Sequence, residues 1–504
     1  MGIVKLKTTD GQDIAFRDEI AGQGGMKDVF FAPDRRYVVA FFRERQDANT
    51  RERLQSICGT YRERIFNQVG GQYWKDLFCW PTAIVEHQGL LGLVAPIYQD
   101  NFFFKHGSVN DDCLGIRGRE KEGKWFASAM HQNRWLDPRE RGNWRNYFRV
   151  CILTCRAVRR MHAAGLAHSD LSYKNVLIDP SSGGACIIDI DGLVVPGKYP
   201  PGVVGTPDFI APEVMATRDV APGDPKKALP RRETDQHALG VLIYMYLLHR
   251  HPLRGRKVHD MDDTERDEWL AMGERALFIE HPQDPSNRYT VDWVKKNYDR
   301  TWQYHVPQMD LHKLPYTVLG PYLAPLMERS FVHGLHSPAE RPTADDWETA
   351  LIKTVDLMQP CANTACSHQW FVFDNTTRPR CPFCGTAFHG VLPILNLYSK
   401  RGETYKPDNH RLTVYHDQYL YAWHANRNVF PNERLADANK PPVGYFKFHN
   451  GNWLLCNQTL PNARDVTEDK PVPPNSFVVL SEGKQVLLSP EDGGRLVQVQ
   501  LVNC

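Results

Sequence analysis

Three polar side chains near the middle of the chain have the types and spacing that phosphoryl transfer needs. Asp170 and Asn175 lie five residues apart in HSDLSYKNVLID (168–179), and Asp189 follows the next apolar run. Phosphoryl transfer uses one carboxylate to orient the attacking hydroxyl and further oxygen ligands to hold Mg²⁺ on the phosphates. Two adjacent strand ends would bring these three side chains together. Taken alone, Asp170 and Asn175 are equally consistent with a capped turn before a strand.

A glycine-rich turn near the N-terminus has the layout of a phosphate-binding loop. The stretch GQGGMKDVFF (22–31) places Gly22, Gly24 and Gly25 between two β-prone runs. Glycine allows the backbone to approach a phosphate closely. Lys27 lies within the same stretch, so the residue that neutralises the phosphates has to be identified.

Strand alternation bears on that choice. Side chains alternate between the faces of a strand, so in YVVAFF (37–42) Ala40 and Phe42 share the face that lines the cleft, and Arg43 points the other way. By the same rule Lys27 lies on the side of Val29, and neighbouring strands are only about 4.8 Å apart. We therefore predict Lys27 as the phosphate cation. The alternatives are a solvated loop lysine at this position, or Arg43 as the cation.

The elements that position these residues follow from the apolar patterns. Residues 1–97 alternate short apolar runs with turns and include one helical stretch, which predicts a small sheet with one helix. Residues 144–356 have mostly helical spacing. Two polar insertions have no clear period: one precedes this region (105–142) and one lies within it (254–312). The longest apolar run, ALGVLIYMYLL (238–248), is too short for a bilayer, which takes about 20 residues, and predicts a buried helix.

Composition excludes several classes of protein. The net charge is +2 over 504 residues, so no global basic field favours nucleic acid. The N-terminal residues show no apolar signal segment. Eight of the twelve cysteines are scattered singly, unlike a secreted disulfide scaffold, so we expect a reducing, cytoplasmic setting.

Four clustered cysteines predict a zinc site. Cys361 and Cys366 form one pair, and Cys381 and Cys384 form another within CPFCG. Two facing pairs suit tetrahedral Zn²⁺, and a short segment of this kind would depend on the metal for its stability. Free buried cysteines are the alternative reading. Two nearby histidines are less favoured substitute ligands: His368 and His389.

Five motifs in order carry a resemblance to a known family. HxDLxxxN, IIDxD, GTPDFIAPE (205–213), DQHALGVLIY (235–244) and ERPT (340–343) make residues 15–356 resemble a eukaryotic-like (Hanks-type) protein kinase. The resemblance implies a bilobal α+β fold that binds ATP and Mg²⁺. Its appended zinc ribbon and β-rich tail make the chain similar to kinases of bacterial stress and tellurite-resistance gene clusters. That likeness implies a metal-dependent phosphatase and a von Willebrand A-type protein as partners.

The resemblance also implies residue roles. Asp170 is the catalytic aspartate, Asn175 and Asp189 are the Mg²⁺ ligands, and Leu177 lies beneath the adenine while Val29 covers it. Ala40 and the three glycines complete the nucleotide site. Four further positions are implied to have supporting roles: Glu213 and Arg341 as a buried pair, Asp235 as the anchor of the catalytic-loop backbone, and Thr206 as the threonine of serine/threonine kinases.

The sequence departs from the family pattern around these motifs. Ser169 replaces the usual arginine, which implies that activity is not switched by loop phosphorylation, and Ser172 replaces a lysine whose charge Lys174 is placed to supply. The metal motif reads Asp189-Ile190-Asp191; here Asp191 is a second ligand or, as slightly favoured, a turn cap. Aligning Asp191 as the metal ligand itself fits the pattern less well.

Phe42 stands where kinases carry the third-strand lysine, and Lys27 stands at the third glycine of GxGxxG. This arrangement resembles the with-no-lysine kinases. Such a lysine usually pairs with a glutamate of the small-lobe helix. Glu52 and Glu63 are the candidates, but both fall opposite the apolar stripe of that helix, so neither is identified as the partner.

We therefore expect an α+β, bilobal kinase followed by a zinc ribbon and an all-β sandwich. The expected boundaries are 1–97 (N-lobe), 98–356 (C-lobe), 357–390 (zinc ribbon) and 391–504 (a domain that resembles a degenerate forkhead-associated domain without its Ser-Arg-x-x-His pattern). The predicted activity is ATP-dependent transfer to Ser/Thr of a protein substrate. The alternative is a pseudokinase that binds nucleotide or acts as a scaffold. Nucleic-acid binding by the ribbon lacks a basic and aromatic surface.

Overall fold

The computed structural model describes residues 2–67, 71–195, 205–221, 223–306, 308–373, 378–431 and 440–504. The chain divides into two compact units. The first comprises Met1–Gly142, Asn146–His312 and Pro325–Glu348, and the second comprises Asn143–Arg145, Lys313–Ala324 and Thr349–Cys504. The predicted kinase lobes fall largely in the first unit, and the cysteine pairs and the β-rich tail fall in the second.

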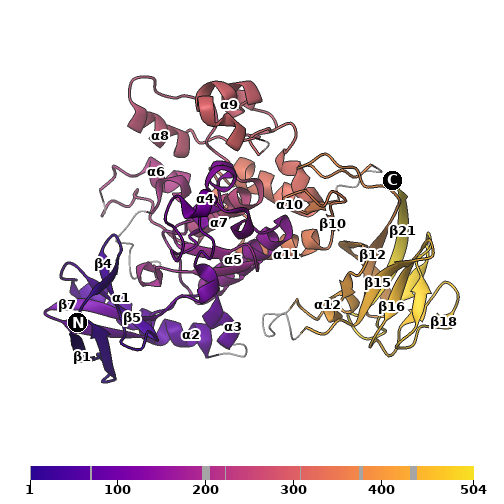
Figure 1. The fold of residues 1–504 in the computed structure, drawn as a ribbon, viewed down its shortest axis with the longest axis horizontal. Coiled ribbons are helices and arrows are strands. Elements are labelled where there is room, and N and C mark those ends of the chain that lie inside the picture. The colour runs from indigo at the N-terminus through magenta and orange to yellow at the C-terminus, as the bar shows by residue number, and fades with distance from the viewer. Residues whose placement is uncertain are drawn as a thin grey trace. The chain divides into compact units, whose positions relative to one another are not determined.

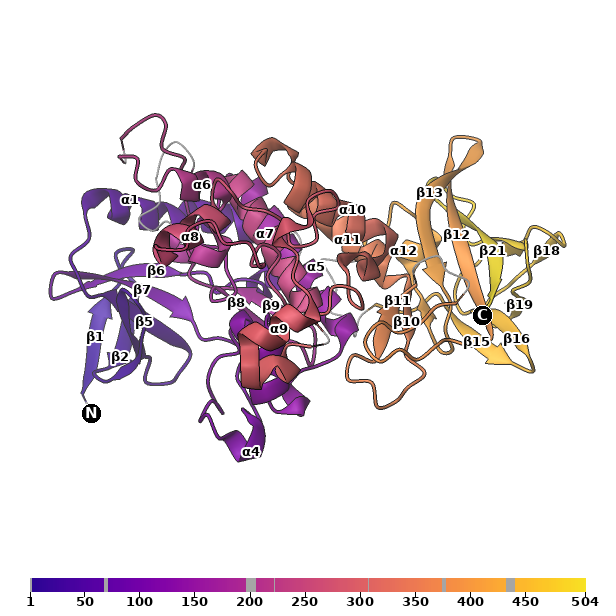
Figure 2. The same cartoon turned by 90° about the horizontal axis from the view of Figure 1, so that it is seen from above.

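The first unit begins with the predicted small sheet (Figure 1). Five antiparallel strands have the order β3-β4-β5-β7-β6, and a separate β1-β2 hairpin lies beside them (Figure 2). Their bounds are β1 Ile3–Lys7, β2 Asp13–Arg17, β3 Ile20–Gln23, β4 Lys27–Phe31, β5 Tyr37–Phe42, β6 Ala83–His87 and β7 Leu90–Pro96.

The two faces of this sheet are both apolar but pack on different elements. One face packs with the hairpin through Phe16, Val39 and Phe41. The other face packs Phe42 against Leu54 of the helix α1 (Ala48–Ser56). Lys27 is paired with Phe42, and Val29 with Ala40, so the alternation predicted from the sequence is confirmed.

The helix beside the sheet is not regular throughout. After α1 the chain widens into a π-helical turn, Ile57–Tyr61, and continues as α2 (Arg62–Phe66) and α3 (Gly71–Asp76). Asp47 caps the start of α1 by accepting a hydrogen bond from the Thr50 N–H at 2.8 Å. The predicted helical stretch is therefore present as α1, the π-helical turn and α2, and α3 is a further helix beyond it.

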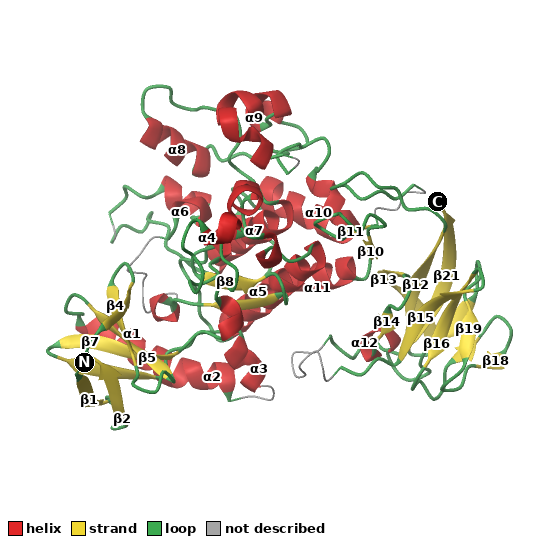
Figure 3. Cartoon of the chain, in the orientation of Figure 1, coloured by secondary structure: helices red, strands yellow, loops and turns green. Residues whose placement is uncertain are grey.

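The rest of the first unit is mainly helical, as predicted, and Figure 3 shows its helices in red around one short hairpin. The hairpin is β8 (Val176–Asp179) with β9 (Gly184–Ile187). The helices are α4 Val109–Asp112, α5 Trp144–Ala163, α6 Pro212–Ala216, α7 Arg232–Leu248, α8 Thr264–Met272, α9 Val291–Tyr298, α10 Gly320–Glu328 and α11 Ala344–Val355. The apolar run 238–248 is the buried part of α7. Among the described helices, none combines the length and the apolar character needed to cross a membrane.

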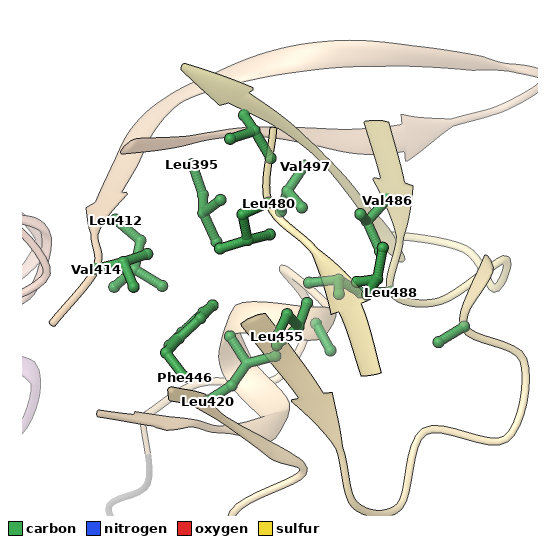
Figure 4. Packing of buried hydrophobic residues seen from close by; sticks show 14 of the residues in the cluster. Leu395, Leu412, Val414, Leu420, Phe446, Leu455, Leu480, Val486, Leu488 and Val497 are labelled. Atoms are coloured by element: carbon green, nitrogen blue, oxygen red, sulfur yellow. The ribbon is translucent and has the colours of Figure 1, made fainter. Parts of the chain in front are cut away.

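The second unit is built mostly from strands. Two sheets have the orders β13-β12-β21-β20-β17-β18 and β14-β15-β16-β19, and a β10-β11 pair precedes them. Residues from both sheets, among them Leu395, Phe446 and Leu455, form one buried cluster between them (Figure 4). The bounds are β10 Met358–Pro360, β11 Trp370–Val372, β12 Val391–Arg401, β13 Thr404–Thr413, β14 Tyr419–Leu420, α12 Ala422–Ala425, β15 Gly444–His449, β16 Asn452–Asn457, β17 Arg464–Asp465, β18 Lys470–Pro471, β19 Phe477–Val479, β20 Gln485–Leu487 and β21 Arg495–Asn503.

Candidate functional site

The carboxylate of Asp170 is held on both of its oxygens. Oδ1 accepts hydrogen bonds from the Thr206 backbone N–H at 2.7 Å and from the Thr206 hydroxyl at 2.9 Å. Oδ2 accepts a hydrogen bond from the Asn175 side-chain amide at 2.9 Å, and the same amide donates to the Asp170 carbonyl at 2.8 Å. These contacts fix the direction in which the carboxylate points, which is what a group that orients a hydroxyl requires.

The loop that carries Asp170 is fixed from beneath by Asp235 of α7. Asp235 accepts hydrogen bonds from the backbone N–H groups of His168 at 2.7 Å and Ser169 at 3.2 Å, and it also bonds the ring of His162 at 3.0 Å. Ser169 has a positive φ of 68°, which is uncommon outside glycine. A buried carboxylate that accepts two backbone donors stabilises this strained turn, as the family resemblance implies for Asp235.

Ser169, Ser172 and Lys174 lie in the same loop as Asp170 and differ in their surroundings. Ser172 is buried, and its hydroxyl is 3.3 Å from that of Thr206. Lys174 is exposed on the same loop. A cavity of about 10 Å³, enough for roughly one water molecule, lies between the loop and α7, lined by Ser169, Asp170 and Asp235 among others.

The β8–β9 hairpin brings Asp189 next to Asn175. The Ile188 N–H donates to the Asn175 carbonyl at 3.0 Å, and Asp189 follows directly in the left-handed region, with φ 59°. Asn175 uses its amide N–H₂ on Asp170, so its side-chain oxygen has no recorded donor among the described residues. A carboxylate and an amide oxygen are ligands that Mg²⁺ accepts, so this pair fits that ion.

Lys27 reaches the same place from β4. Its ammonium lies 2.6 Å from each oxygen of Asp191 and 3.3 Å from Asp189 Oδ1. Burial would lower the pKa of Lys27, but the charges of Asp191 and Asp189 outweigh burial and raise it. Burial raises the pKa of Asp189, the adjacent Asp191 charge raises it further, and Lys27 offsets part of the rise.

Asp191 was the residue whose role the sequence left open. It lies in the turn Ile190–Gly192, and its contacts with Lys27 show that it is an ion-pair partner rather than only a turn cap. Glu52 and Glu63 are both exposed, and the recorded partners of Lys27 are the two aspartates. The signal in the sequence was the second carboxylate two residues after Asp189.

Arg43 lies on the other side of the glycine turn. Its guanidinium donates to the Gly24 carbonyl at 2.7 Å, to the Gly25 carbonyl at 3.3 Å and to Asp28 at 2.9 Å. Among the described residues, a methyl group added at Gly22, Gly24 or Gly25 would meet no atom of a non-neighbouring residue closer than 3.7 Å. The described part of the chain therefore leaves the space around these glycines open.

The predicted adenine contacts lie on two different elements. Val29 and Ala40 are paired across β4 and β5 on the face of Lys27. Leu177 of β8 is fully buried and packs with Phe102 and Cys186. The structure thus places Val29 and Ala40 together and records Leu177 in a separate cluster.

Glu213 and Arg341 form the buried pair that the resemblance implies. The guanidinium of Arg341 is fully buried and donates to both oxygens of Glu213, at 2.9 and 2.7 Å. It also donates to the carbonyls of Glu233, Gly334 and Leu335. The loop after Thr206 is thereby tied to the distant segment around residue 341.

The four clustered cysteines converge in the second unit. Their sulfur atoms all lie within 4.8 Å of one another, with Cys361 and Cys384 3.5 Å apart and Cys366 and Cys381 3.9 Å apart. Burial opposes ionisation of Cys384, but contacts with Thr386 prevail and lower the pKa of its thiol to about 6. His389 is exposed, and the His368 ring stacks on Phe383 at 3.6 Å, so the described cluster consists of cysteines alone.

Comparison with known proteins supports the interpretation of the first unit. Residues 129–346 match the family described as "Protein kinase domain". "Dual serine/threonine and tyrosine protein kinase" of Strongylocentrotus purpuratus is 24% identical over 177 residues, which cover 34% of this chain and 16% of that protein. "Serine/threonine-protein kinase PknD" of Chlamydia abortus is 30% identical over 132 residues, which cover 21% of this chain and 13% of that protein.

The chain thus spans only a small part of the length of these relatives. A crystal structure of the "Toxoplasma gondii specific rhoptry antigen kinase domain" has a TM-score of 0.34 and 15% identity, covering 56% of this chain and 84% of that one, a likeness too distant to support an inference. The matched family and the serine/threonine kinases among the relatives agree with the geometry around Asp170. Residues 129–346 are therefore similar to a protein kinase domain, and serine/threonine kinases are among the relatives that the chain resembles.

Proposed function

We propose that this chain is an ATP-dependent protein kinase that transfers the γ-phosphate to serine or threonine of a protein substrate. The observation that carries the proposal is the fixed carboxylate of Asp170, held on one oxygen by Thr206 and on the other by Asn175. Such a carboxylate orients the acceptor hydroxyl and takes its proton, a contribution of about 10²–10⁴-fold. Transfer by this route needs little covalent chemistry from the protein, because positioning and charge stabilisation supply most of the catalysis.

The other residues of the site complete this arrangement. Asn175 and Asp189 would hold Mg²⁺, which when bound neutralises charge on the phosphates. Lys27 supplies a cation from β4, on the face of the sheet that also carries Val29 and Ala40. Gly22, Gly24 and Gly25 leave open space beside that cation. Leu177 is proposed to contact the base from the other side.

The test is transfer of labelled phosphate from Mg-ATP to a generic protein substrate, followed by phosphoamino-acid analysis. We expect the wild type to label serine or threonine, and Asp170→Ala to lose about 10²–10⁴-fold in rate while still binding nucleotide. Absence of transfer by the wild type with every divalent metal tried would contradict the kinase proposal. Nucleotide binding without transfer would instead favour the pseudokinase alternative, for which the phenylalanine at position 42 is the supporting observation.

We also propose that the cysteine cluster binds one structural Zn²⁺. Tetrahedral coordination with Zn–S bonds of about 2.3 Å places sulfur atoms about 3.8 Å apart. The two recorded separations, 3.5 and 3.9 Å, bracket that value. Metal analysis of the purified chain is expected to find one zinc per molecule, and Cys381→Ser to abolish it.

The β-rich tail is proposed to be an interaction module. Its two sheets and shared core support the predicted sandwich, while a forkhead-associated identity remains a proposal. A metal-dependent phosphatase and a von Willebrand A-type protein remain the proposed partners. A pull-down with the full chain that recovers neither class would contradict that part of the proposal.

A further inference from the structure

The ammonium group of Lys27 is held by a carboxylate from an unexpected element. Both oxygens of Asp191 lie 2.6 Å from the Lys27 nitrogen, whereas Asp189 makes one contact at 3.3 Å. The side chains of Lys27 and Asp191 are 18% and 14% exposed, while that of Asp189 is 49% exposed. The close pair is therefore Lys27 with Asp191, and Asp189 keeps about half of its side-chain surface exposed.

A lysine at this position needs a partner to fix its direction. Its ammonium is a point charge on a flexible four-carbon stem, so a phosphate contact from a neighbouring strand depends on what holds the stem. Phe42, opposite Lys27 on β5, places its ring 5.4 Å from the ammonium. That ring attracts the cation from one side but supplies no carboxylate to accept its hydrogen bonds.

In the described part of the helix beside the sheet, the side chains that pack in the Phe42 cluster are uncharged. Leu54 packs on Phe42, and Cys58 in the π-helical turn packs against the same cluster. Burial, followed by the charge of Asp191, raises the pKa of the Cys58 thiol to about 12. Cys58 thus presents a neutral group near Asp191, and both glutamates of the helix are exposed.

We propose that Asp191 is the positioning residue for Lys27 and takes the place of a helix glutamate. This inference rests on the proposed kinase function. Its consequence concerns regulation: the turn that carries Asp189 also sets the phosphate cation, so a movement of α1 does not connect or disconnect that cation. The lysine also offsets the repulsion between two carboxylates two residues apart.

The competing role for Asp191 is that of a second Mg²⁺ ligand. Both of its oxygens are engaged by one ammonium in the structure, whereas Asp189 is the more exposed carboxylate and lies next to Asn175. The geometry therefore divides the two aspartates into one that binds the cation of the protein and one left for the metal.

The first test is a double-mutant cycle in the full chain with Lys27→Met, Asp191→Asn and the double variant. In nucleotide-free protein we expect each single change to lower Tm by about 2–4 °C, and the double change to lower it by less than the sum. For transfer, Asp191→Asn is expected to reduce kcat/KM for ATP at least about tenfold in the wild-type background and less than about twofold when Lys27 is already methionine. Additive losses in both measurements would overturn the proposal.

The second test separates positioning from metal binding. We expect the Mg²⁺ concentration for half-maximal rate to be the same for Asp191→Asn and wild type, and a marked rise would assign Asp191 to the metal instead. Cys58→Glu added to Asp191→Asn is expected to recover part of the lost kcat/KM, with Cys58→Gln as the uncharged control of equal size. Asp191→Glu keeps the charge and is expected to retain more kcat/KM than Asp191→Asn. The proposal would also be overturned if neither Asp191→Glu nor the Cys58→Glu, Asp191→Asn double variant had a higher kcat/KM than Asp191→Asn.

The two proposals fail differently. If the wild type transfers no phosphate but the Tm cycle shows coupling, the kinase function fails and the Lys27–Asp191 pair stands. If the wild type transfers phosphate and the cycles are additive, the kinase function stands and the positioning role fails.

Discussion

The candidate phosphoryl-transfer site and the cysteine cluster are assembled in opposite ways. The four cysteines lie within 24 residues of one another, from 361 to 384, and their spacing alone predicts a metal site. The candidate site joins Lys27 to Asp191 across 164 positions and Thr206 to Asp170 across 36. Local chemistry can be read from spacing, whereas long-range chemistry needs the fold or a family resemblance to reveal which residues meet.

The largest predicted effect comes from removing the metal that the cysteine cluster is proposed to bind. Structural zinc contributes about 10–16 kcal/mol to binding and folding in model peptides. We expect a chelator, or Cys381→Ser, to expose the segment around residues 358–384 to limited proteolysis. Cys456→Ser, in the same unit but outside the cluster, is the control. An unchanged cleavage pattern after chelation would contradict the structural role.

The next largest effect is expected on the free energy of unfolding when the ion pair between Arg341 and Glu213 is broken. Arg341→Met leaves the Glu213 carboxylate without its fully buried partner 128 positions away, and breaking such a pair costs about 3–5 kcal/mol. Arg329→Met removes an arginine that is 41% exposed and paired with Asp346, so about 1 kcal/mol or less is expected. Urea unfolding of both variants measures the difference, and equal losses would refute the distinction.

Acid pH tests two buried histidines of the first unit, His249 and His251. Burial lowers the pKa of His249 and of His251 to about 4, from an unfolded value of about 6.5. The folded state keeps both neutral while the unfolded state binds protons, so stability is complete above pH 6.5 and falls as the pH drops toward 4. Each of these two groups adds a slope of at most about 1.4 kcal/mol per pH unit in that window.

Urea unfolding between pH 7 and 5 measures this slope. His249→Asn, which tolerates the positive φ of 55° at that position, is expected to lower the slope by up to about 1.4 kcal/mol per pH unit. A slope that His249→Asn leaves unchanged would show that other groups account for the acid sensitivity.

The smallest predicted effect is on the phosphate-transfer rate when the Thr206 hydroxyl is removed. Thr206→Val removes the hydroxyl donor to Asp170 but keeps the backbone N–H donor, so about 1.5 kcal/mol, or roughly a tenfold lower transfer rate, is expected. Thr206→Ser keeps the hydroxyl and is expected to retain most of the rate. Equal rates for valine and serine would remove the hydroxyl from the mechanism.

The sequence was sufficient for much of the fold and part of the candidate site. Strand alternation placed Lys27 on the face of Val29, and the observed register agrees, because period-2 geometry is a local property. The partner of Lys27 was not predictable, because the family pattern points to a glutamate of the adjacent helix. A short Asp-x-Asp motif gives no sign of which carboxylate faces a strand that lies more than a hundred residues earlier.

The burial of charged side chains in the polar insertion at 105–142 could not be predicted from the sequence either. Charges in a segment without periodicity suggest a solvated loop, yet Lys121 is buried and pairs with Glu140 at 3.1 Å and with Asp179 at 2.9 Å. Only the position of β8 reveals that these three charges compensate one another. Buried charge of this kind depends on partners that spacing does not identify.

The contacts of Arg43 have a stereochemical consequence for the glycine turn. A trans peptide points its carbonyl and its following N–H in opposite directions. Because Arg43 binds the carbonyls of Gly24 and Gly25, the N–H groups of Gly25 and Met26 point away from the guanidinium. Neither N–H has a recorded acceptor among the described residues. An arginine on the outer side of the turn thus presets two amide dipoles toward the opposite side, where an incoming anion would meet donors that need no reorientation.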